Sequence, residues 1–426
     1  MHLDKLTGRR VALLGMGADL TAAVPAIVAA GPAEIRVAGD QLPDELPEGL
    51  PRDPVTPLAD ACAWAEVIVR SPGFSPYRPE VAAAVRRGAM VTNPVDLWMG
   101  THAASRTVVG VTGTKGKSTV THLVGALAPA HGLRVGVAGN LGPPVLGETW
   151  DHQAPNVILE VSSYQAADLH HVPNLVVVTH LAEDHLPWHG GRERYHADKL
   201  RLVTNEGGTA GEVLVPDSSP AARDGVEALG VAPTVVAVPA GPPELPAHRV
   251  ANAALAVEVL NRLGGPAPTV DAVIAAARTS LPGRLDPCPG PTGLLCVDDA
   301  LASNPTATAA ALAWLRGIGR ATVVLLGGED RGADVAPLVD EITRWPVGKL
   351  RAVALPDSGE ELAIRCGADL VAVASSVAEA TALAVEAAGP AGAVLLSPGA
   401  PTPSRVGNWS TRSNQFREAL TCRTRH

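Results

Sequence analysis

Short apolar runs alternate with longer alanine-rich stretches along this chain. Residues 10–14, 34–38 and 67–69 form such runs, and the segment after Gly17 has a helical pattern to about Ala30. A strand that is covered on both faces is apolar at nearly every position, so these runs predict parallel strands. Strands that alternate with helices in this way are typical of α/β domains.

Three domains are predicted from the grouping of these elements. The chain has 426 residues, and at roughly 100–200 residues per domain this length allows about two to four domains. The predicted domains are residues 1–105, 106–282 and 283–426. In the second domain we expect a strand at 107–112, loops with short strands between 205 and 246, and helices at 250–263 and 270–278.

The third domain shows polar or glycine clusters where its predicted strands end. The strands at 294–297, 322–326 and 393–396 are followed by Asp298-Asp299, Gly327-Gly328 and Ser397-Pro398-Gly399. We expect a helix at 306–315 between the first two strands. Ligands of open parallel sheets bind beyond the carboxyl ends of the strands, so these clusters predict one site.

Composition narrows the classes of function. Hydrophobic residues make up 46% of the chain and charged residues 18%, which is an ordinary globular balance. The net charge of −9 argues against a general binder of nucleic acid or of anionic membranes. No run of 18 apolar residues and no leader pattern is present, and the five cysteines form no C-x-x-C pair. We therefore expect a cytoplasmic protein without a disulfide framework or a cysteine zinc site.

The strongest chemical signal is Gly113-Thr114-Lys115-Gly116-Lys117-Ser118-Thr119, between a predicted strand and a helix at 120–127. Glycines let main-chain N–H groups curl around phosphate oxygens, and a helix start favours negative charge. Lys117 can reach the β- and γ-phosphates, and a hydroxyl of Ser118 or Thr119 can ligate Mg²⁺. The first glycine of a general P-loop would fall at Val111, so a glycine-rich helix cap is the alternative. The order of strand, loop, lysine and helix favours phosphate binding.

Three further side chains suit a nucleotide and metal site. Glu160 ends the predicted strand 157–160, and Mg²⁺ prefers carboxylate oxygen. His185 follows the strand-like residues 175–180 as a second candidate ligand, and Lys199 lies in a helical pattern further on. Each has an ordinary alternative, namely a solvated carboxylate, a surface histidine and an exposed helix lysine.

A weaker signal lies near the start of the chain. Gly15-Met16-Gly17 follows the first predicted strand, and Asp40 follows the second. This is a partial dinucleotide-binding pattern without its third glycine, and a tight strand-to-helix turn explains it equally well. A nicotinamide oxidoreductase built on this pattern would leave the phosphate-loop lysine and the strand-end groups unexplained.

Taken in order, these motifs resemble the Mur ligase family, and within it the MurD-like glutamate-adding enzymes. The motifs are Thr112–Thr119, Gly139-Asn140-Leu141-Gly142, Leu159–Gln165, Glu183-Asp184-His185, Lys199, His248 with Asn252, Leu281-Pro282-Gly283-Arg284, Asp299 and Gly327–Gly332. The resemblance extends from Gly15 to Phe416, and its central motifs are the specific ones.

The resemblance implies an α/β protein of three domains. These are a Rossmann-like N-terminal domain for a UDP-linked substrate, a P-loop central ATPase domain with a parallel sheet, and a Rossmann-like C-terminal domain for an amino acid. It also implies that ATP activates the carboxylate of UDP-N-acetylmuramoyl-L-alanine as an acyl-phosphate, which the amine of glutamate attacks. The product would be a peptidoglycan precursor. We expect a monomer without nucleic-acid or membrane partners.

The resemblance further implies roles for single residues. ATP would be held by residues 113–119, with Lys117 at the γ-phosphate, and would contact Asn252, Arg284 and Asp299. Two Mg²⁺ sites would be formed by Ser118, Thr119, Glu160, His185 and a carbamylated Lys199. A carbamate is anionic, which suits a metal ligand. The UDP-muramoyl substrate would be contacted by Gly15, Met16, Gly17, Ser71, Pro72, Gly73, Asn140, Ser162 and Gln165.

Several positions depart from the pattern of D-glutamate enzymes. Arg249 replaces an asparagine and Gly283 a histidine of the family pattern, and Leu301 replaces a lysine of D-glutamate enzymes. Thr402 and Trp409 stand where those enzymes have a serine and a phenylalanine. The glutamate pocket would consist of Ser303, Arg331, Thr402 and Trp409. A cation and a hydroxyl there are enough to hold a dicarboxylate.

These departures, together with the stretch His185–Gly191, are similar to the branch that adds L-glutamate. L-Glutamate is therefore favoured as the substrate. A D-glutamate-adding enzyme, a ligase that uses another amino acid in a specialised pathway, and a P-loop nucleotide-binding regulator stay open as alternatives.

Overall fold

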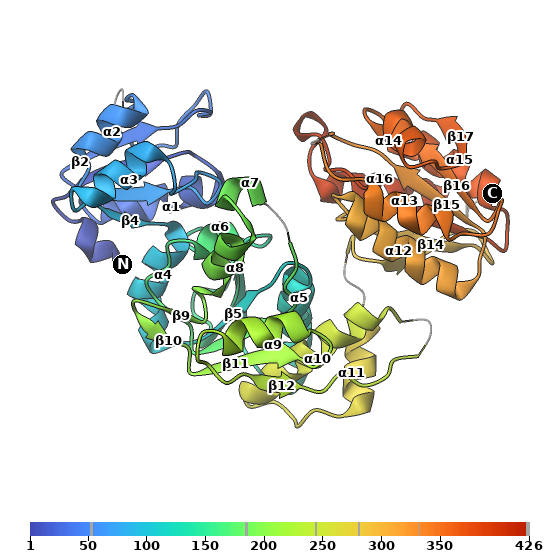
Figure 1. Cartoon of the computed structure of the whole chain (residues 1–426), viewed down its shortest axis with the longest axis horizontal. Coiled ribbons are helices and arrows are strands. Elements are labelled where there is room, and N and C mark those ends of the chain that lie inside the picture. The colour runs from blue at the N-terminus through green and yellow to red at the C-terminus, as the bar shows by residue number, and fades with distance from the viewer. Residues whose placement is uncertain (52–53, 184–185, 243–244, 280–281, 331, 423–426) are drawn as a thin grey trace. The chain divides into compact units, whose positions relative to one another are not determined.

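The computed structural model describes residues 1–51, 54–183, 186–242, 245–279, 282–330 and 332–422 (Figure 1). The chain forms two compact units. The first contains Met1–Ala240 and Ala247–Ala277, and the second contains Gly241–Pro246 and Arg278–His426. Two of the three main sheets lie in the first unit and the third lies in the second.

The first sheet has four parallel strands in the order β2-β1-β3-β4. Its elements are η1 (Leu3–Leu6), β1 (Arg10–Leu14), α1 (Ala18–Ala29), β2 (Glu34–Ala38), α2 (Leu58–Trp64), β3 (Val67–Arg70), α3 (Pro79–Arg86), β4 (Met90–Thr92) and α4 (Pro94–His102). Val11 and Leu13 of β1 pack with α1, and Ala12 and Leu14 pack with α2 and α3. Alternate residues of a strand face opposite sides, which explains why every position of β1 after Arg10 is apolar.

The second sheet has six parallel strands in the order β12-β11-β8-β5-β7-β6. Its strands are β5 (Thr107–Thr112), β6 (Val135–Gly139), β7 (Asn156–Glu160), β8 (Leu175–Val178), β11 (Glu212–Pro216) and β12 (Thr234–Val236). Its helices and short segments are η2 (Ala103–Ser105), α5 (Lys117–Leu127), η3 (Ala128–His131), α6 (Ser163–Ala166), α7 (Leu186–His189), α8 (Arg192–Leu200), a hairpin of β9 (Thr204–Asn205) and β10 (Gly208–Thr209), α9 (Pro220–Glu227), α10 (Ala247–Arg262) and α11 (Val270–Ala277). Helices α5 and α10 pack together against this sheet. Because β5 and β7 are neighbours in this sheet, the glycine loop that follows β5 lies beside the end of β7.

The third sheet has the order β13-β14-β18-β15-β16-β17, with only β13 antiparallel to its neighbour. Its elements are β13 (Asp286–Cys288), β14 (Leu295–Asp298), α12 (Pro305–Ile318), β15 (Thr322–Leu326), α13 (Ala336–Thr343), β16 (Leu350–Ala354), α14 (Gly359–Arg365), β17 (Leu370–Val373), α15 (Val377–Ala388), β18 (Ala393–Leu396), η4 (Ser404–Val406) and α16 (Trp409–Cys422). Val324 and Leu326 of β15 pack with α12, α13 and α14, while Val323 and Leu325 pack with α15 and α16. The polar clusters predicted at the ends of β14, β15 and β18 thus follow adjacent strands.

The α/β fold class is confirmed, and the predicted elements are present with ends shifted by at most three residues. Several helices were not predicted, among them α2, α3 and α4 of the first unit and α13 to α16 of the second. Between 205 and 246 the structure adds α9, which buries Ala222 and Val226. Gly225 obscures the helical pattern there, and its Cα approaches Leu181 so closely that a Cβ would lie 3.0 Å from that side chain.

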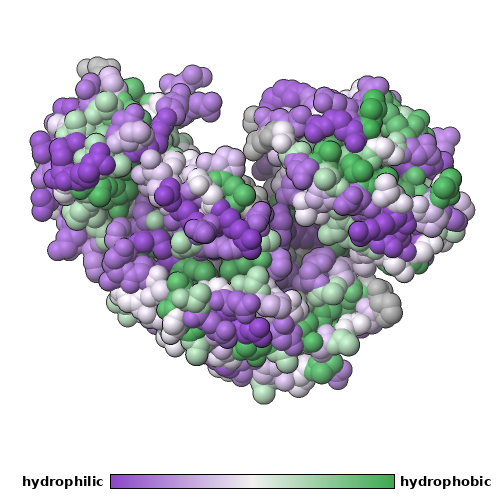
Figure 2. Space-filling view, in the orientation of Figure 1, coloured by the Kyte–Doolittle hydropathy of each residue, from purple (hydrophilic) through white to green (hydrophobic). Residues whose placement is uncertain are grey.

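The face in Figure 2 shows hydrophilic residues mixed with small hydrophobic areas over both units. In the described ranges, no helix combines the length and the apolar character that crossing a bilayer requires.

Candidate functional site

Two glycines in left-handed conformations shape the loop between β5 and α5. Gly113 has a φ of 140° and Gly116 a φ of 93°, a region that disfavours side chains. A Cβ would meet Thr179 at the first position and the amide of Asn252, from α10, at the second. Helix α5 begins at Lys117 without a side-chain cap. Its first N–H groups and its dipole therefore favour an anion, and the loop has the shape of a phosphate cradle.

Two lysines converge on this loop. The Nζ atoms of Lys117 and Lys199 each lie 3.0 Å from the carbonyl oxygen of Gly113. Lys199 comes from α8, is only 2% exposed, and lies with its Nζ 4.8 Å from the ring centroid of Tyr195. The Tyr195 hydroxyl is in turn 3.0 Å from Thr114 Oγ1. Lys199 is thus buried against the glycine loop and is not an exposed helix lysine.

Glu160 ends β7, beside the strand that carries the loop. Its carboxylate is 2% exposed and accepts a hydrogen bond of 3.0 Å from Asn140 Nδ2. Asn140 follows Gly139, whose φ of 115° lets the main chain pass close to the main chain of Glu160. The fold thereby brings the glycine turn after β6 to the strand-end carboxylate.

A cavity of about 100 Å³ opens where these elements meet. It is lined by Thr114, Lys117, Asn140, Ser162, Ser163, Tyr164, Tyr195 and Lys199. Five of these residues were predicted site residues, and Ser163, Tyr164 and Tyr195 were not. Ser163 and Tyr164 belong to the strand-end motif that the sequence analysis singled out. Tyr195 has no such signal beyond the rarity of tyrosine in this chain.

The predicted substrate-facing residues also meet within the first unit. Ser162 caps α6 and exchanges hydrogen bonds with Gln165 in a capping box. Gln165 Nε2 donates to Asp19 of α1 at 2.7 Å, and burial raises the pKa of Asp19 while this hydrogen bond opposes the rise. Gly17 N donates to Ser71 Oγ at 3.2 Å, which joins the glycine turn after β1 to the loop Ser71–Gly73. The first and second sheets are therefore linked through the predicted substrate residues.

Arg70, which sequence reasoning missed, ties these loops together. Its fully buried guanidinium donates to both oxygens of Asp168 at 2.6 Å. It also donates to the Tyr164 carbonyl at 2.5 Å and to the carbonyls of Ser71, Pro72 and Phe74. An arginine that ends an otherwise apolar strand was the available signal, because a buried cation needs acceptors on several sides.

In the second unit, Asp299 follows β14 and lies close to Gly283. The Asp299 carboxylate accepts from Leu285 N at 3.1 Å and from Ser397 Oγ at 2.9 Å. Burial raises the pKa of Asp299 to about 7, and these hydrogen bonds together with the charge of Arg284 oppose the rise.

Two departures from the D-glutamate pattern are sterically coupled. A Cβ on Gly283 would lie 2.9 Å from the ring of Trp409, so a side chain at 283 and this ring exclude one another. The Leu301 main chain donates to the Gly283 carbonyl at 3.0 Å. Ser303 is exposed, and Thr402 Oγ1 is buried without a hydrogen-bond partner among the described residues.

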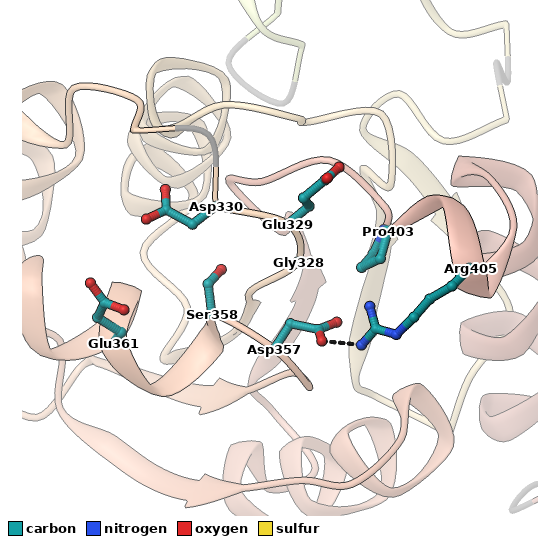
Figure 3. A pocket seen from close by; sticks show the side chains of 8 residues that line it. All are labelled: Gly328, Glu329, Asp330, Asp357, Ser358, Glu361, Pro403 and Arg405. Carbon is teal, nitrogen blue, oxygen red and sulfur yellow. Dashed lines mark hydrogen bonds and ion pairs between the residues drawn. The ribbon is translucent and has the colours of Figure 1, made fainter. Parts of the chain in front are cut away.

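A second cavity, of about 450 Å³, lies within the second unit where the loop after β15 approaches the start of α14 (Figure 3). It is lined by Gly328, Glu329, Asp330, Asp357, Ser358, Glu361, Pro403 and Arg405. Arg405 pairs with Asp357 across its edge. Glu329 and Asp330 belong to the motif Gly327–Gly332 quoted from the sequence, whereas the carboxylates of Asp357 and Glu361 were not predicted.

Two predicted residues, His185 and Arg331, lie outside the described residues. Within the described ranges, no group of three or more histidine, cysteine, aspartate or glutamate side chains is arranged to hold a metal ion. The predicted ligands Ser118, Thr119 and Lys199 are of other residue types.

The sequence is similar to known proteins in the glycine loop and over nearly the whole chain. The family described as the Mur ligase middle domain matches residues 111–231. A UDP-N-acetylmuramoyl-L-alanine--L-glutamate ligase from Micromonospora sp. is 36% identical over 99% of this chain and 98% of its own length. Proteins of the same name from Salinispora tropica and Xylella fastidiosa are 35% and 33% identical, over 99% and 98% of this chain and 99% and 96% of their own lengths.

Solved structures share the fold at low identity. The UDP-N-acetylmuramate-alanine ligase MurC from Thermotoga maritima has a TM-score of 0.56 and 15% identity, covering 97% of this chain and 100% of that chain. MurF ligase from Thermotoga maritima, solved with ADP, has a TM-score of 0.56 and 14% identity, covering 99% and 97%. At these identities the likeness concerns the fold alone.

Proposed function

Because this chain belongs to the Mur ligase family, it is an ATP-dependent amide ligase of peptidoglycan synthesis, and we propose that it joins L-glutamate to UDP-N-acetylmuramoyl-L-alanine. The observation that carries the proposal is the match, over nearly the full length, to three relatives named for this reaction. The geometry of the site supports each part of it separately.

In this proposal ATP occupies the loop around Gly113 and Gly116, with its γ-phosphate at Lys117. The cradle that a Cβ would fill and the lysine at the helix start support this position. The γ-phosphoryl group passes to the carboxylate of the alanyl acceptor and forms an acyl-phosphate. The amine of glutamate then attacks the carbonyl carbon, and phosphate leaves as the amide forms. The chain contributes mainly positioning and charge stabilisation, which phosphoryl transfer needs.

Two Mg²⁺ ions belong to the proposal. Ser118 and Thr119 are buried at the start of α5, and Glu160 ends the strand that pairs with β5, so hard oxygen donors are available. Bound Mg²⁺ would neutralise charge on the phosphate oxygens. His185 and a carbamylated Lys199 are proposed for the second ion. The burial of Lys199 beside Lys117 supports the carbamate, because an anionic group there replaces repulsion between two ammonium groups by attraction.

The UDP-muramoyl acceptor is proposed to bind along the first unit. The glycine turn after β1 and the Ser71–Gly73 loop would hold the uridine diphosphate, and Asn140, Ser162 and Gln165 would face the muramoyl-alanine. The hydrogen bonds that join Gly17 to Ser71 and Gln165 to Asp19 support one continuous binding surface.

The second unit is proposed to bind the amino acid through Ser303, Thr402 and Trp409, with Arg331 as its cation. The exclusion between Trp409 and a side chain at Gly283 supports a reshaped pocket. A change of handedness requires a new place for one carboxylate partner and leaves the ATP chemistry unchanged.

The test is a coupled assay of ADP and phosphate release with UDP-N-acetylmuramoyl-L-alanine and either L- or D-glutamate. We expect release with L-glutamate only, and none when the acceptor is omitted. Release with D-glutamate in its place would assign the D-glutamate reaction instead. If neither glutamate supports release while another amino acid does, the substrate proposal is wrong.

A further inference from the structure

His189 joins Ser163 and Asp198 into one hydrogen-bonded chain beside the cavity of the first unit. Its Nε2 atom lies 3.0 Å from Ser163 Oγ, and its Nδ1 atom lies 2.6 Å from Asp198 Oδ2. The other oxygen of Asp198 accepts a hydrogen bond of 2.5 Å from the Tyr77 hydroxyl. Ser163, His189 and Asp198 are 3%, 0% and 5% exposed.

Aromatic rings enclose this chain of groups. The ring of His189 lies 5.6 Å from that of Tyr164, 5.1 Å from that of Tyr195 and 4.5 Å from that of Trp188, measured between centroids. The protein has only three tyrosines, and all three contact His189 or its partner Asp198. This enclosure excludes water, so the hydrogen bonds of the imidazole have no solvent to replace them.

The direction of each hydrogen bond follows from its partners. A carboxylate only accepts, so Asp198 requires a proton of His189 on Nδ1. The imidazole is fully buried, which favours its neutral form, and in that form Nε2 is an acceptor. Burial and the hydrogen bond to Asp198 raise the pKa of Tyr77, so its phenol keeps its proton and donates. Ser163 must then donate its only proton to Nε2. Its oxygen keeps two acceptor positions and has no donor left for any other partner.

Ser163 lines the same cavity as Lys117 and Lys199. We propose that Ser163 Oγ is a dedicated acceptor for an N–H group of a bound substrate, with His189 and Asp198 as positioning residues that fix its direction. The inference rests on the proposed function, in which two substrates bring an N–H group to the reacting carboxylate. These are the amine of the amino acid and the alanyl amide of the acceptor.

Serine hydrolases use the same connectivity to activate the serine itself for attack. In a ligase the nucleophile is the incoming amine, and the Ser163 oxygen would accept and align an N–H group.

Asp198→Asn tests the direction without changing the shape. The Tyr77 hydroxyl keeps the amide oxygen on its side, so the amide nitrogen donates to Nδ1 and the proton of His189 moves to Nε2. Ser163 then accepts from His189 and turns its own proton toward the cavity. We expect ¹⁵N NMR of the imidazole, assigned with His189→Gln, to show protonated Nδ1 in the wild type and protonated Nε2 in Asp198→Asn. A wild-type imidazole that is protonated on Nε2, either alone or together with Nδ1, would overturn the inference.

Kinetics test the role of the acceptor. Ser163→Ala should lower kcat/KM by about 10–100-fold, as expected for the loss of a hydrogen bond to a charged or strongly polar group. Asp198→Asn should cost at least as much. The double variant should be no slower than the slower single variant, because the direction of an absent hydroxyl has no effect. Tyr77→Phe, which leaves the proton of His189 on Nδ1, is the matched control and should lose less than about 5-fold.

Four outcomes decide between the possibilities. A rise in the KM of glutamate assigns the N–H group to the amine, and a rise in the KM of the UDP-muramoyl acceptor assigns it to the alanyl amide. Losses that multiply in the double variant would mean that Asp198 acts through Lys199 or through the fold, and would overturn the inference. A wild type that is inactive with both glutamates refutes the proposed function instead, and the NMR result still decides the direction of the chain.

Discussion

Lys117 and Lys199 donate hydrogen bonds to the same atom, the main-chain oxygen of Gly113, each at 3.0 Å. Two ammonium groups on one carbonyl repel each other, and the repulsion grows when the groups are removed from water. An ATP γ-phosphate beside Lys117 and a carbamate on Lys199 would each place negative charge where these two ammonium groups lie close together. We therefore expect nucleotide binding at this loop to depend on the charge of Lys199, which comes from α8.

Lys117→Ala should reduce the rate of ADP release by about 100-fold or more, because the side chain stabilises charge that develops on the transferring phosphoryl group. The matched control is Lys349→Ala, which removes one of the five lysines from an exposed position of the second unit. The measurement is the coupled assay with saturating substrates. A Lys117→Ala variant as active as the control would remove this lysine from the mechanism.

Lys199→Ala should also lose turnover, and short carboxylic acids such as acetate or formate should restore part of it. The reason is that a small carboxylate can occupy the place of the carbamate and supply its negative charge. The measurement is the rate of ADP release as a function of acid concentration, with chloride at the same ionic strength as the control. Full activity of the variant without any added acid would contradict the carbamate role.

The fold was predictable where the pattern is local. Buried parallel strands such as β5 and β15 are apolar at nearly every position. The glycine loop before α5 predicts both a turn and the start of a helix. Helix α9 was not predicted because Gly225 interrupts its helical pattern. Glycine is favoured there because a Cβ would lie too close to Leu181, a contact that the sequence alone does not reveal.

The site was predictable where one residue type has few other uses, as for Lys117 and Glu160. The hydrogen-bonded series from Tyr77 through Asp198 and His189 to Ser163 was not predictable. Its members are far apart in sequence, and each on its own is an ordinary residue type. The role of Arg70 was hidden for the same reason. Its acceptors become neighbours only when two sheets pack together.

Gly116→Ala should weaken ATP binding far more than a typical glycine substitution in a turn. The new Cβ would need a left-handed conformation and would also meet the side chain of Asn252. Gly132→Ala is the matched control, because Gly132 has a φ of 69° and no atom within 4 Å of the new Cβ. We expect a stability loss of about 1 kcal/mol for the control and about 2–4 kcal/mol for Gly116→Ala. Thermal unfolding and ATP titration provide the measurements, and equal losses in both variants would refute the close contact.

Arg70→Met should raise the KM of the UDP-muramoyl acceptor more than the KM of ATP. The substitution frees the carbonyls of the Ser71–Gly73 loop and leaves the Asp168 carboxylate buried without its cation, which typically costs about 3–5 kcal/mol. Adding Asp168→Asn should recover part of the stability, since the uncompensated charge is then removed, but not the acceptor KM. Stability is measured by denaturant unfolding. Equal rises of both KM values would show that Arg70 supports the unit as a whole and has no special relation to the acceptor loops.

Asp299 should make the stability of the second unit fall as pH rises. Its pKa is raised by burial from 3.8 to about 7, so the folded chain holds this proton more tightly than the unfolded chain. The stabilising contribution of the protonated group is fully present below about pH 4 and is lost as pH increases through about 7. Asp299→Asn keeps a neutral side chain at every pH. At pH 8 it should therefore unfold at a higher temperature than the wild type, and its free energy of unfolding should be higher by up to about 4 kcal/mol. At pH 4 the two unfolding temperatures should be similar. Calorimetry at both pH values measures the difference between the variant and the wild type. If the stability of the variant relative to the wild type falls from pH 4 to pH 8, the raised pKa of Asp299 is contradicted.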